Sequence, residues 1–172
     1  MTLKRSMPPA GSTDASLLIL GSLPGEASLA AQRYYAHPQN QFWRLLGGAL
    51  GEPLADLPYE QRLARLAGRG VALWDVVGTA RRLGSLDGAI REAIANPLRD
   101  YIATHPRLRA VAFNGKTAGR LGRLAFGDPG RIELIDLPSS SPAYTLSFAE
   151  KARRWAVLAS LACSPKVATL DP

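Results

Sequence analysis

The sequence has very few of the residues that most often build disulfides and metal centres. Its 172 residues include one cysteine, Cys163, and two histidines, His37 and His105. A single cysteine excludes a disulfide within the chain and a cysteine-built metal cluster. The two histidines do not form an H-x-x-x-H pair. We therefore expect no metal site.

Long hydrophobic runs are also missing. No apolar stretch reaches the roughly 20 residues that cross a bilayer, so we expect no association with membranes. The first residues, MTLKRSMPPAGSTDAS, lack the apolar block of a secretory signal. The length and a hydrophobic content of 47% are typical of one globular domain with a sizeable core. We expect a flexible leader over 1–14, a single domain over 15–165 and a short tail over 166–172.

Three catalytic motifs are absent as well. The chain has no G-x-x-x-x-G-K-[ST] phosphate loop and no G-x-G-x-x-G, and the triplet Gly115-Lys116-Thr117 lacks the upstream glycine that a phosphate loop needs. The three consecutive serines Ser139, Ser140 and Ser141 are not part of a G-x-S-x-G elbow. These absences disfavour a nucleotide hydrolase and a serine hydrolase.

The sequence has an excess of positively charged residues. Lysine and arginine number 21 against 14 acidic residues, which gives a net charge of +7. A basic surface attracts polyanions such as nucleic acid. An arginine-rich genome produces the same composition with no ligand at all, so charge alone leaves both interpretations open.

Short apolar runs alternate with segments of helical spacing. The runs predict four strands, at 16–20, 71–74, 108–113 and 132–137. The spacing predicts helices at 40–50, 59–67, 98–104, 116–125 and 148–162, and another that begins at Ser85 or Asp87 and ends near Asn96. Alternation of this kind favours parallel strands, and therefore an α/β fold: a three-layer α/β/α sandwich with a four-stranded parallel sheet.

A polar loop follows each predicted strand, and all of these loops should meet at one edge of the sheet. The longest runs from Gly21 to Trp43 and contains two glycines, two prolines and a high density of hydrogen-bonding side chains. Loops at the carboxyl ends of parallel strands are where such folds bind ligands. We interpret this loop as the centre of the active site.

The loops also carry motifs that resemble those of a known family. They are Gly21-Ser22-Leu23-Pro24-Gly25, the segment AHPQNQFW at 36–43, LWDVV, RRLGSLD and LPSSSPAYT. In this order they resemble the uracil-DNA glycosylase superfamily. The AHP-x-N-x-FW segment is similar to the mismatch-specific uracil branch, and the whole combination is closer to the hypoxanthine (deoxyinosine) DNA glycosylase branch. The resemblance covers Leu17 to Ala162 and implies a flipped nucleotide, cut at its N-glycosidic bond without a cofactor.

The resemblance assigns the central roles to the first long loop. Asn40 matches the essential asparagine of the hypoxanthine branch, so we predict that it is catalytic and orients a water. Its position would equally suit a helix cap. Tyr35 matches the aromatic residue that stacks on the flipped base, whereas Tyr34 is expected to brace the loop. Leu23 stands where better-known relatives have the Asp or Asn that positions the water, so that function must lie elsewhere or be missing.

The remaining predicted site residues fall into three groups. Ser22, Leu23 and Asn114 are expected at the base with Tyr35, although Asn114-Gly115 is also a turn signal. Contacts with the DNA backbone are expected from His37, Ser139, Ser140, Ser141 and Tyr144, and Tyr144 is a candidate wedge. Asp75 could stabilise positive charge on the sugar or cap a turn, and Ser85 could line the pocket.

We therefore expect a monofunctional DNA glycosylase that excises hypoxanthine first and uracil second. No lysine lies in the motif segments, so no lyase step is expected. The expected partner is double-stranded and possibly single-stranded DNA, bound by a monomer in the cytoplasm at the nucleoid. The alternatives are a uracil or mismatch-specific glycosylase, a DNA-binding member of the fold without activity, and a nucleoside hydrolase that acts on free inosine.

Overall fold

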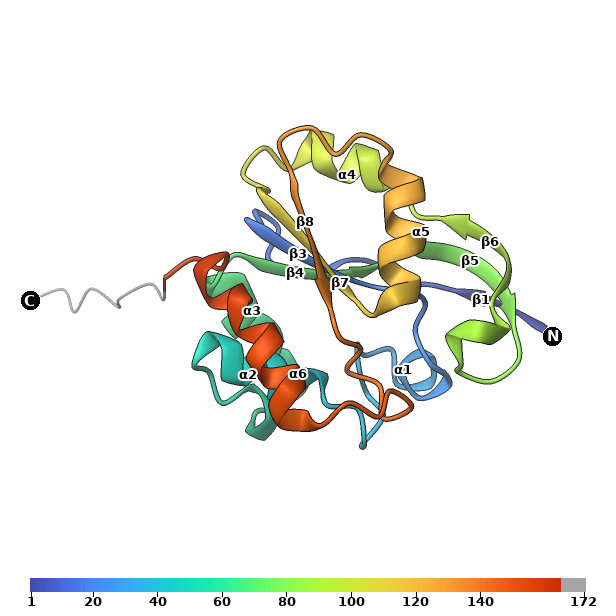
Figure 1. Cartoon of the computed structure of the whole chain (residues 1–172), viewed down its shortest axis with the longest axis horizontal. Coiled ribbons are helices and arrows are strands. Elements are labelled where there is room, and N and C mark those ends of the chain that lie inside the picture. The colour runs from blue at the N-terminus through green and yellow to red at the C-terminus, as the bar shows by residue number, and fades with distance from the viewer. Residues whose placement is uncertain (165–172) are drawn as a thin grey trace, which may run out of the picture.

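A mixed five-stranded sheet forms the centre of the molecule in the computed structural model, which describes residues 1–164 (Figure 1). The strand order is β2-β4-β3-β7-β8. The strands are β2 (Ala10–Gly11), β3 (Leu17–Gly21), β4 (Val71–Asp75), β7 (Ala110–Asn114) and β8 (Glu133–Leu137). β4, β3, β7 and β8 are parallel neighbours, and only β2 is antiparallel to its neighbour β4. The predicted fold class is confirmed, with one short antiparallel strand added at the edge.

Helices cover both faces of this sheet (Figure 1). One face packs against α2 (Phe42–Leu50), α3 (Tyr59–Gly68) and α6 (Phe148–Trp155), together with the short 3-10 helices η1 (Leu54–Asp56) and η3 (Ala156–Ser160). The other face packs against α4 (Leu98–Thr104) and α5 (Lys116–Phe126). The last helix therefore tightens to 3-10 geometry after Trp155, where the sequence predicted a continuous α-helix.

The central strand β3 shows why the sheet has two buried faces. Leu17 and Ile19 belong to the apolar cluster on the α2 side, and Leu18 and Leu20 to the cluster on the α5 side. All four side chains are completely buried. Successive side chains of a strand point to opposite faces, so an unbroken apolar run is what a two-sided sheet requires. Each of these side chains contributes about 1.5–3 kcal/mol by its burial.

A second, antiparallel sheet stands beside the first and replaces the helix predicted up to Asn96. It consists of β1 (Thr2–Arg5), β5 (Val77–Arg82) and β6 (Arg91–Ala95) in the order β1-β5-β6. A 3-10 turn, η2 (Asp87–Ala89), connects β5 to β6. The helix prediction was wrong because every residue of β6 is exposed. Backbone pairing with β5 defines such an edge strand, and hydrophobic periodicity does not reveal it.

The first fourteen residues differ from the flexible leader that we expected. They supply β1, which pairs with β5, and β2, which pairs with β4. Between these strands, the indole of Trp74 and the hydroxyl of Tyr34 both donate hydrogen bonds to the carbonyl of Met7. The predicted tail, 166–172, lies outside the described residues. Within the described chain, no helix is both long and apolar enough to cross a membrane.

The carboxyl ends of the parallel strands lie side by side, which positions the loops that follow them. Gly21 at the end of β3 is in register with Asp75 at the end of β4, and Asn114 at the end of β7 is in register with Leu137 at the end of β8. The first loop also contains a short helix that the sequence did not reveal, α1 (Glu26–Ala31). The segments that carry the motifs therefore leave the sheet at one edge.

Candidate active site

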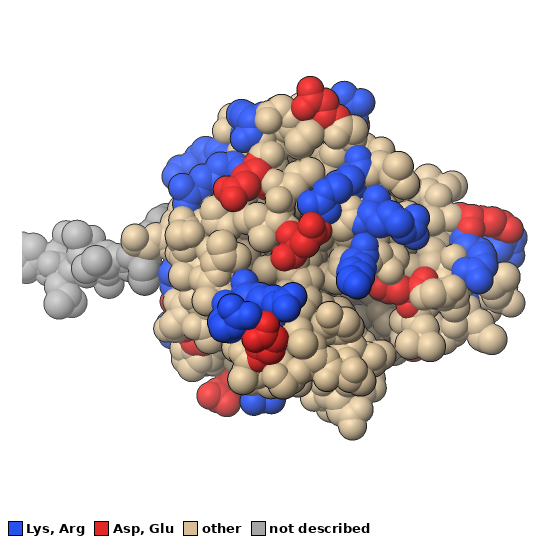
Figure 2. Space-filling model, in the orientation of Figure 1, with Lys and Arg blue, Asp and Glu red and all other residues tan. Residues whose placement is uncertain are grey.

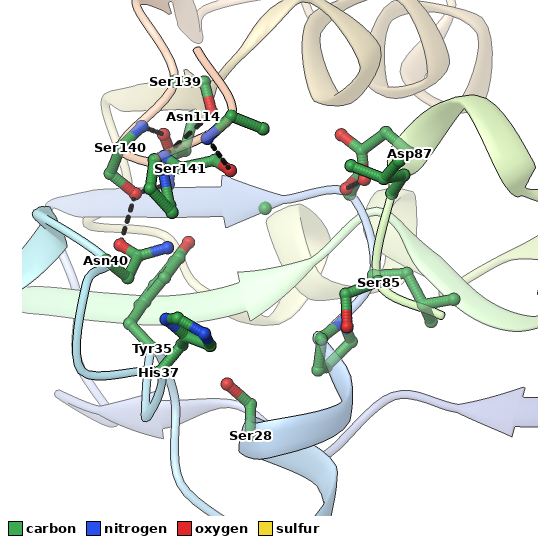
Figure 3. A pocket seen from close by; sticks show the side chains of 18 of the residues that line it. Ser28, Tyr35, His37, Asn40, Ser85, Asp87, Asn114, Ser139, Ser140 and Ser141 are labelled. Atoms are coloured by element: carbon green, nitrogen blue, oxygen red, sulfur yellow. Dashed lines mark hydrogen bonds between the residues drawn. The ribbon is translucent and has the colours of Figure 1, made fainter. Parts of the chain in front are cut away.

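A cavity of about 580 Å³ opens at this edge of the sheet (Figure 3). Residues at or just beyond the carboxyl ends of β3, β4, β7 and β8 all contribute to its wall. The cavity brings together every residue predicted for the site: Ser22, Leu23, Tyr35, His37, Asn40, Asp75, Ser85, Asn114, Ser139, Ser140, Ser141 and Tyr144. This common location supports the grouping of the motifs but does not by itself test the role of any one residue.

One wall of the cavity is a chain of hydrogen bonds through Ser140, and we call Asn40, Asn114 and Ser140 the amide wall. The backbone N–H of Ser140 donates to Oδ1 of Asn114 at 2.9 Å, and Nδ2 of Asn114 donates to Oγ of Ser140 at 2.9 Å. The Ser140 hydroxyl in turn donates to Oδ1 of Asn40 at 2.8 Å. Figure 3 shows these bonds linking loops that are a hundred residues apart in the sequence.

Backbone donors fix the direction of this chain of bonds. Oδ1 of Asn40 also accepts the backbone N–H of Phe42 at 3.0 Å, at the start of α2. A backbone N–H can only donate, so Asn40 must place its oxygen, and not its nitrogen, at this bond. The oxygen has two lone pairs, and both are now used. The Asn40 amide therefore offers the cavity N–H donors, and its nitrogen points toward Tyr35 in Figure 3.

Helices α2 and α6 support the amide wall from behind. Gln41 donates its backbone N–H to the carbonyl of Ser140, and the indole of Trp155 donates to the carbonyl of Pro138 at 2.9 Å. The ammonium of Lys151, a buried residue, donates to the carbonyl of Ser141 and to the side chain of Gln41. These bonds fix the backbone of the last polar loop, so the amide wall is a rigid part of the site.

Tyr35 lies next to the amide wall in an unusual backbone conformation. Its φ of 54° falls in the left-handed region, which residues with a side chain rarely adopt. Its ring stacks on Phe42, with centroids 3.6 Å apart and an interplanar angle of 8°. Its hydroxyl is buried and has no hydrogen-bond partner among the described residues. Phe42 covers one face of the ring, and Tyr35 is among the residues that line the cavity.

Asp75 and Gly21 form the floor of the cavity. A Cβ atom on Gly21 would lie 2.7 Å from Oδ1 of Asp75 and 3.1 Å from the hydroxyl of Tyr35, so only glycine leaves room for both groups. Asp75 is 3% exposed, and its Oδ2 accepts a hydrogen bond from the hydroxyl of Ser6. Burial raises the pKa of Asp75 to about 7. The Asp75 carboxyl therefore keeps its proton to a much higher pH than an exposed aspartate does.

The opposite wall is lined by Ser22 of the first loop and by Ser85 and Asp87 of the segment that connects β5 to β6. Together with Arg82 of β5, we call these residues the carboxylate wall. The Ser22 hydroxyl donates to Oδ1 of Asp87 at 2.5 Å. The hydroxyl of Ser85 accepts the backbone N–H of Glu26 at 2.9 Å. Asp87 was expected only as a helix cap, because the wrong helix prediction for this segment concealed its place in the cavity.

Arg82 is the anchor of the carboxylate wall. Its side chain is completely buried, and its guanidinium donates to the carbonyls of Leu23 and Pro24 in the first loop and of Gly84 in its own loop. Asp87 is close enough for its charge to oppose the lowering of the Arg82 pKa by burial. A buried guanidinium that donates to carbonyls holds two loops together. Arg82 lies in the RRLGSLD motif, but the sequence did not predict this role for it.

The exposed residues of the rim complete the site. His37 is exposed, and its Nδ1 accepts the backbone N–H of Gln39 at 3.2 Å. Tyr144 is the aromatic residue of the last polar loop and is 37% exposed. Leu86, at 65% exposure, was not predicted as a site residue although it lines the cavity. Leu23 is buried and supplies only an apolar surface, as expected.

Positive charge gathers beside the cavity. Figure 2 shows lysine and arginine side chains over α5, which carries Lys116, Arg120 and Arg123 on its exposed side. A smaller cavity of about 280 Å³ lies between this helix and the last polar loop, and Lys116 and Arg154 line it. It shares Ser139, Tyr144 and Asp87 with the main cavity. A polyanion could therefore approach the site along α5.

Known proteins of similar sequence belong to the family that the motifs resemble. The family model of the Uracil DNA glycosylase superfamily matches residues 8–162. A protein of Methanosarcina acetivorans named hypoxanthine DNA glycosylase is 40% identical over 82% of this chain and 88% of its own. A protein of the same name from Methanosarcina barkeri is 37% identical over 89% of this chain and 96% of its own.

A solved structure agrees with these matches. The solution NMR structure of a candidate uracil DNA glycosylase from Methanosarcina acetivorans superimposes with a TM-score of 0.81 at 38% identity, over 93% of this chain and 99% of that one. The resemblance drawn from the motifs is confirmed over nearly the whole chain. On sequence and on fold alike, this chain belongs to the uracil DNA glycosylase superfamily.

Proposed function

We propose that this protein is a monofunctional DNA glycosylase that excises deaminated bases, hypoxanthine first and uracil second, and leaves an abasic site for base excision repair. The observation that carries the proposal is the amide wall beside Tyr35, in a cavity that is large enough for a purine. Two relatives named hypoxanthine DNA glycosylase, which cover most of this chain, support the choice of base. No lysine is among the described residues that line the main cavity, which argues against a Schiff-base step.

In this proposal the flipped base stacks on the free face of Tyr35, which supports its binding by about 1–3 kcal/mol. Phe42 stacks on the other face of the ring and keeps it in place. Asn114 shares its amide with Ser140, so its main contribution is to hold the amide wall, and one N–H remains for the base. Ser22 and Leu23 close the other side of the base pocket.

Asn40 contributes hydrogen-bond donors to the reaction. Its oxygen is already used by Phe42 and Ser140, so it cannot accept a proton from an attacking water. It can donate to the oxygen of that water and so hold it near the anomeric carbon. Asn40 then acts as the group that positions the water. Departure of the base is largely dissociative. The proton of the water must pass to a group other than Asn40.

The DNA backbone would lie along the rim and α5. Serine hydroxyls and backbone N–H groups of 139–141 are normal phosphate contacts, and His37 and the cations of α5 extend this surface. Tyr144 is placed to enter the gap left by the flipped base. The proposed substrate is duplex DNA, with single strands as a second possibility, bound by a monomer at the nucleoid in the cytoplasm.

The test uses labelled duplexes that contain deoxyinosine, deoxyuridine or neither, followed by alkali to cleave abasic sites. We expect cutting at deoxyinosine and weaker cutting at deoxyuridine. Cutting at deoxyuridine alone would indicate a uracil or mismatch-specific enzyme, and binding without cutting would indicate a DNA-binding protein without activity. Cleavage of free inosine would indicate a nucleoside hydrolase. Asn40→Ala should abolish cleavage while the fold is retained, and cleavage at the wild-type rate would contradict the proposed role of Asn40.

A further inference from the structure

Two large apolar side chains stay exposed to solvent at the cavity. Among the described residues that line the main cavity, they are Leu86 and Tyr144. Tyr144 belongs to the last polar loop, and Leu86 lies between Ser85 and Asp87 of the carboxylate wall. Figure 3 shows Ser85 and Asp87 across the cavity from residues 139–141 of the last polar loop. A lone exposed leucine is common on protein surfaces, so the setting of Leu86 decides whether it has a function.

The backbone on both sides of Leu86 is held in place by hydrogen bonds from the first loop. The hydroxyl of Ser85 accepts the backbone N–H of Glu26 at 2.9 Å. On the other side, Oδ1 of Asp87 accepts the hydroxyl of Ser22 at 2.5 Å. The protein therefore presents an apolar side chain to solvent from a fixed backbone. A group that is fixed before binding loses little conformational freedom when a partner covers it.

The chemistry of Leu86 suits the interior of a DNA duplex better than its phosphate backbone. The side chain has no polar atom, and the neighbours Ser85 and Asp87 carry no positive charge that could pair with a phosphate. Proteins that bend or open DNA insert leucine and other apolar side chains between base steps. An extruded nucleotide leaves such a gap in the stack, and its extrusion requires that pairing and stacking be broken.

We propose that Leu86 is a second wedge residue, which enters the base stack beside the flipped nucleotide from the carboxylate wall, while Tyr144 enters from the last polar loop. This inference rests on the proposed function. Leu86 is removed from water when it enters the stack, and this burial stabilises the open duplex. Leu86 is a positioning residue that acts on the flipping step, before the glycosidic bond breaks.

The test compares Leu86→Ala with Leu83→Ala, a matched control from the same segment. Leu83 is 74% exposed against 65% for Leu86, but it lines neither of the two cavities described above. Single-turnover cleavage of a deoxyinosine duplex should fall by about 10-fold or more in Leu86→Ala, because most of the buried apolar surface of the wedge is lost. Leu83→Ala should cleave at the wild-type rate. Leu86→Met, which keeps an apolar side chain of similar size, should recover most of the rate.

Two further readouts separate a wedge from a residue that contacts the base inside the cavity. The fluorescence of a 2-aminopurine placed next to deoxyinosine rises when its neighbour leaves the stack, and this rise should be slower and smaller in Leu86→Ala. The second readout places deoxyinosine in a short bubble of unpaired bases, where extrusion costs less free energy. The loss of activity in Leu86→Ala should shrink on this substrate.

The outcomes distinguish a failure of the inference from a failure of the proposed function. Equal cleavage of the paired duplex by Leu86→Ala and Leu83→Ala overturns the inference alone. An equal loss for Leu86→Ala on the paired and bubble substrates also overturns it, because Leu86 would then act on the base in the cavity. If the wild type cleaves only deoxyuridine, the same comparisons are made with that base. A wild type that cleaves neither base overturns the proposed function and the inference together.

Discussion

The two walls of the cavity are built in different ways. The amide wall joins loops that leave the central parallel sheet, and neutral side chains bond one another in a fixed direction. The carboxylate wall joins Ser22 of the first loop to β5 and the segment after it, and the buried guanidinium of Arg82 holds two loops through their carbonyls. The first wall can orient a substrate, and the second brings charge to it. One wall therefore supplies directed hydrogen bonds, and the other supplies charge.

The largest loss of stability that we expect comes from removing the guanidinium of Arg82, which holds the carboxylate wall together. Arg82→Met keeps the length of the side chain but leaves the carbonyls of Leu23, Pro24 and Gly84 without their donor. We expect a loss of about 3–5 kcal/mol in the free energy of unfolding, which is typical when one partner of a buried charged network is removed. Urea denaturation measures it.

The neighbouring residue provides a matched control for this change. Arg81 is exposed and pairs with the exposed Glu92 at 2.9 Å. Arg81→Met should change the free energy of unfolding by no more than about 1 kcal/mol, since exposed ion pairs contribute little. Equal losses for the two variants would show that Arg82 does not anchor the wall.

The next prediction concerns the pH dependence of stability that comes from Asp75, on the floor between the two walls. Burial raises its pKa to about 7, above the ordinary aspartate pKa of about 3.9, so the folded state binds the proton more tightly than the unfolded state. The stability contribution of Asp75 is therefore fully present below about pH 4 and is lost as the pH rises through 7, by up to about 4 kcal/mol. Asp75→Asn cannot ionise, so it should be more stable than the wild type at pH 8 and similar to it at pH 4.5.

Urea denaturation at pH 4.5, 6 and 8 measures this difference. Other groups titrate in the same range, so the informative quantity is wild type minus variant at each pH. A difference that stays constant across the range would show that Asp75 titrates near its ordinary pKa.

A smaller effect is expected from breaking the amide wall at its centre. Ser140→Ala removes the donor to Asn40 and leaves Nδ2 of Asn114 without its acceptor in a buried site. The expected cost is about 1–3 kcal/mol of stability. Cleavage of deoxyinosine should slow by about 10- to 100-fold, because Asn40 is less well oriented.

Ser139→Ala is the matched control for Ser140→Ala. Its hydroxyl accepts only the backbone N–H of Ser141, in the same loop, and makes no bond to either amide. It should therefore cost less stability than Ser140→Ala, and any loss of activity should appear as weaker DNA binding. If the two variants slow the single-turnover step equally, the amide wall does not orient Asn40.

The same two walls show how far the sequence could predict the structure. The apolar run from Leu17 to Leu20 predicts strand β3, and the motif residues follow the strands directly. The sequence therefore predicted which residues form the amide wall. The hydrogen bonds within the amide wall were not predicted, because they depend on which lone pairs remain free once the loops meet. Within the carboxylate wall, Ser22 and Ser85 were predicted for the site, whereas Arg82 and Asp87 were not. The antiparallel sheet that positions them was missed because its strand β6 is exposed along its whole length and carries no apolar period.

Arg82 and Asp87 illustrate the physical reason for this limit. A buried arginine that bonds to carbonyls leaves no signature in composition or spacing, since backbone carbonyls occur at every residue. Asp87 was noticed as a helix cap, the most common role of an aspartate near a predicted helix start. Its bond to Ser22 depends on the packing of the antiparallel sheet against the first loop, which is a contact between segments 65 residues apart.

The smallest effect we predict distinguishes two adjacent tyrosines. The hydroxyl of Tyr34 donates to the carbonyls of Met7 and Pro8, so Tyr34→Phe should cost about 1 kcal/mol of stability. The hydroxyl of Tyr35 is buried without a partner among the described residues, so Tyr35→Phe should be neutral or slightly stabilising. If Tyr35→Phe is as stable as the wild type but cleaves more slowly, its hydroxyl contacts the substrate, and the unpaired group is explained by function. A loss of stability in Tyr35→Phe that matches Tyr34→Phe would mean that the hydroxyl has a partner in the free protein, and the amide wall would then extend to Tyr35.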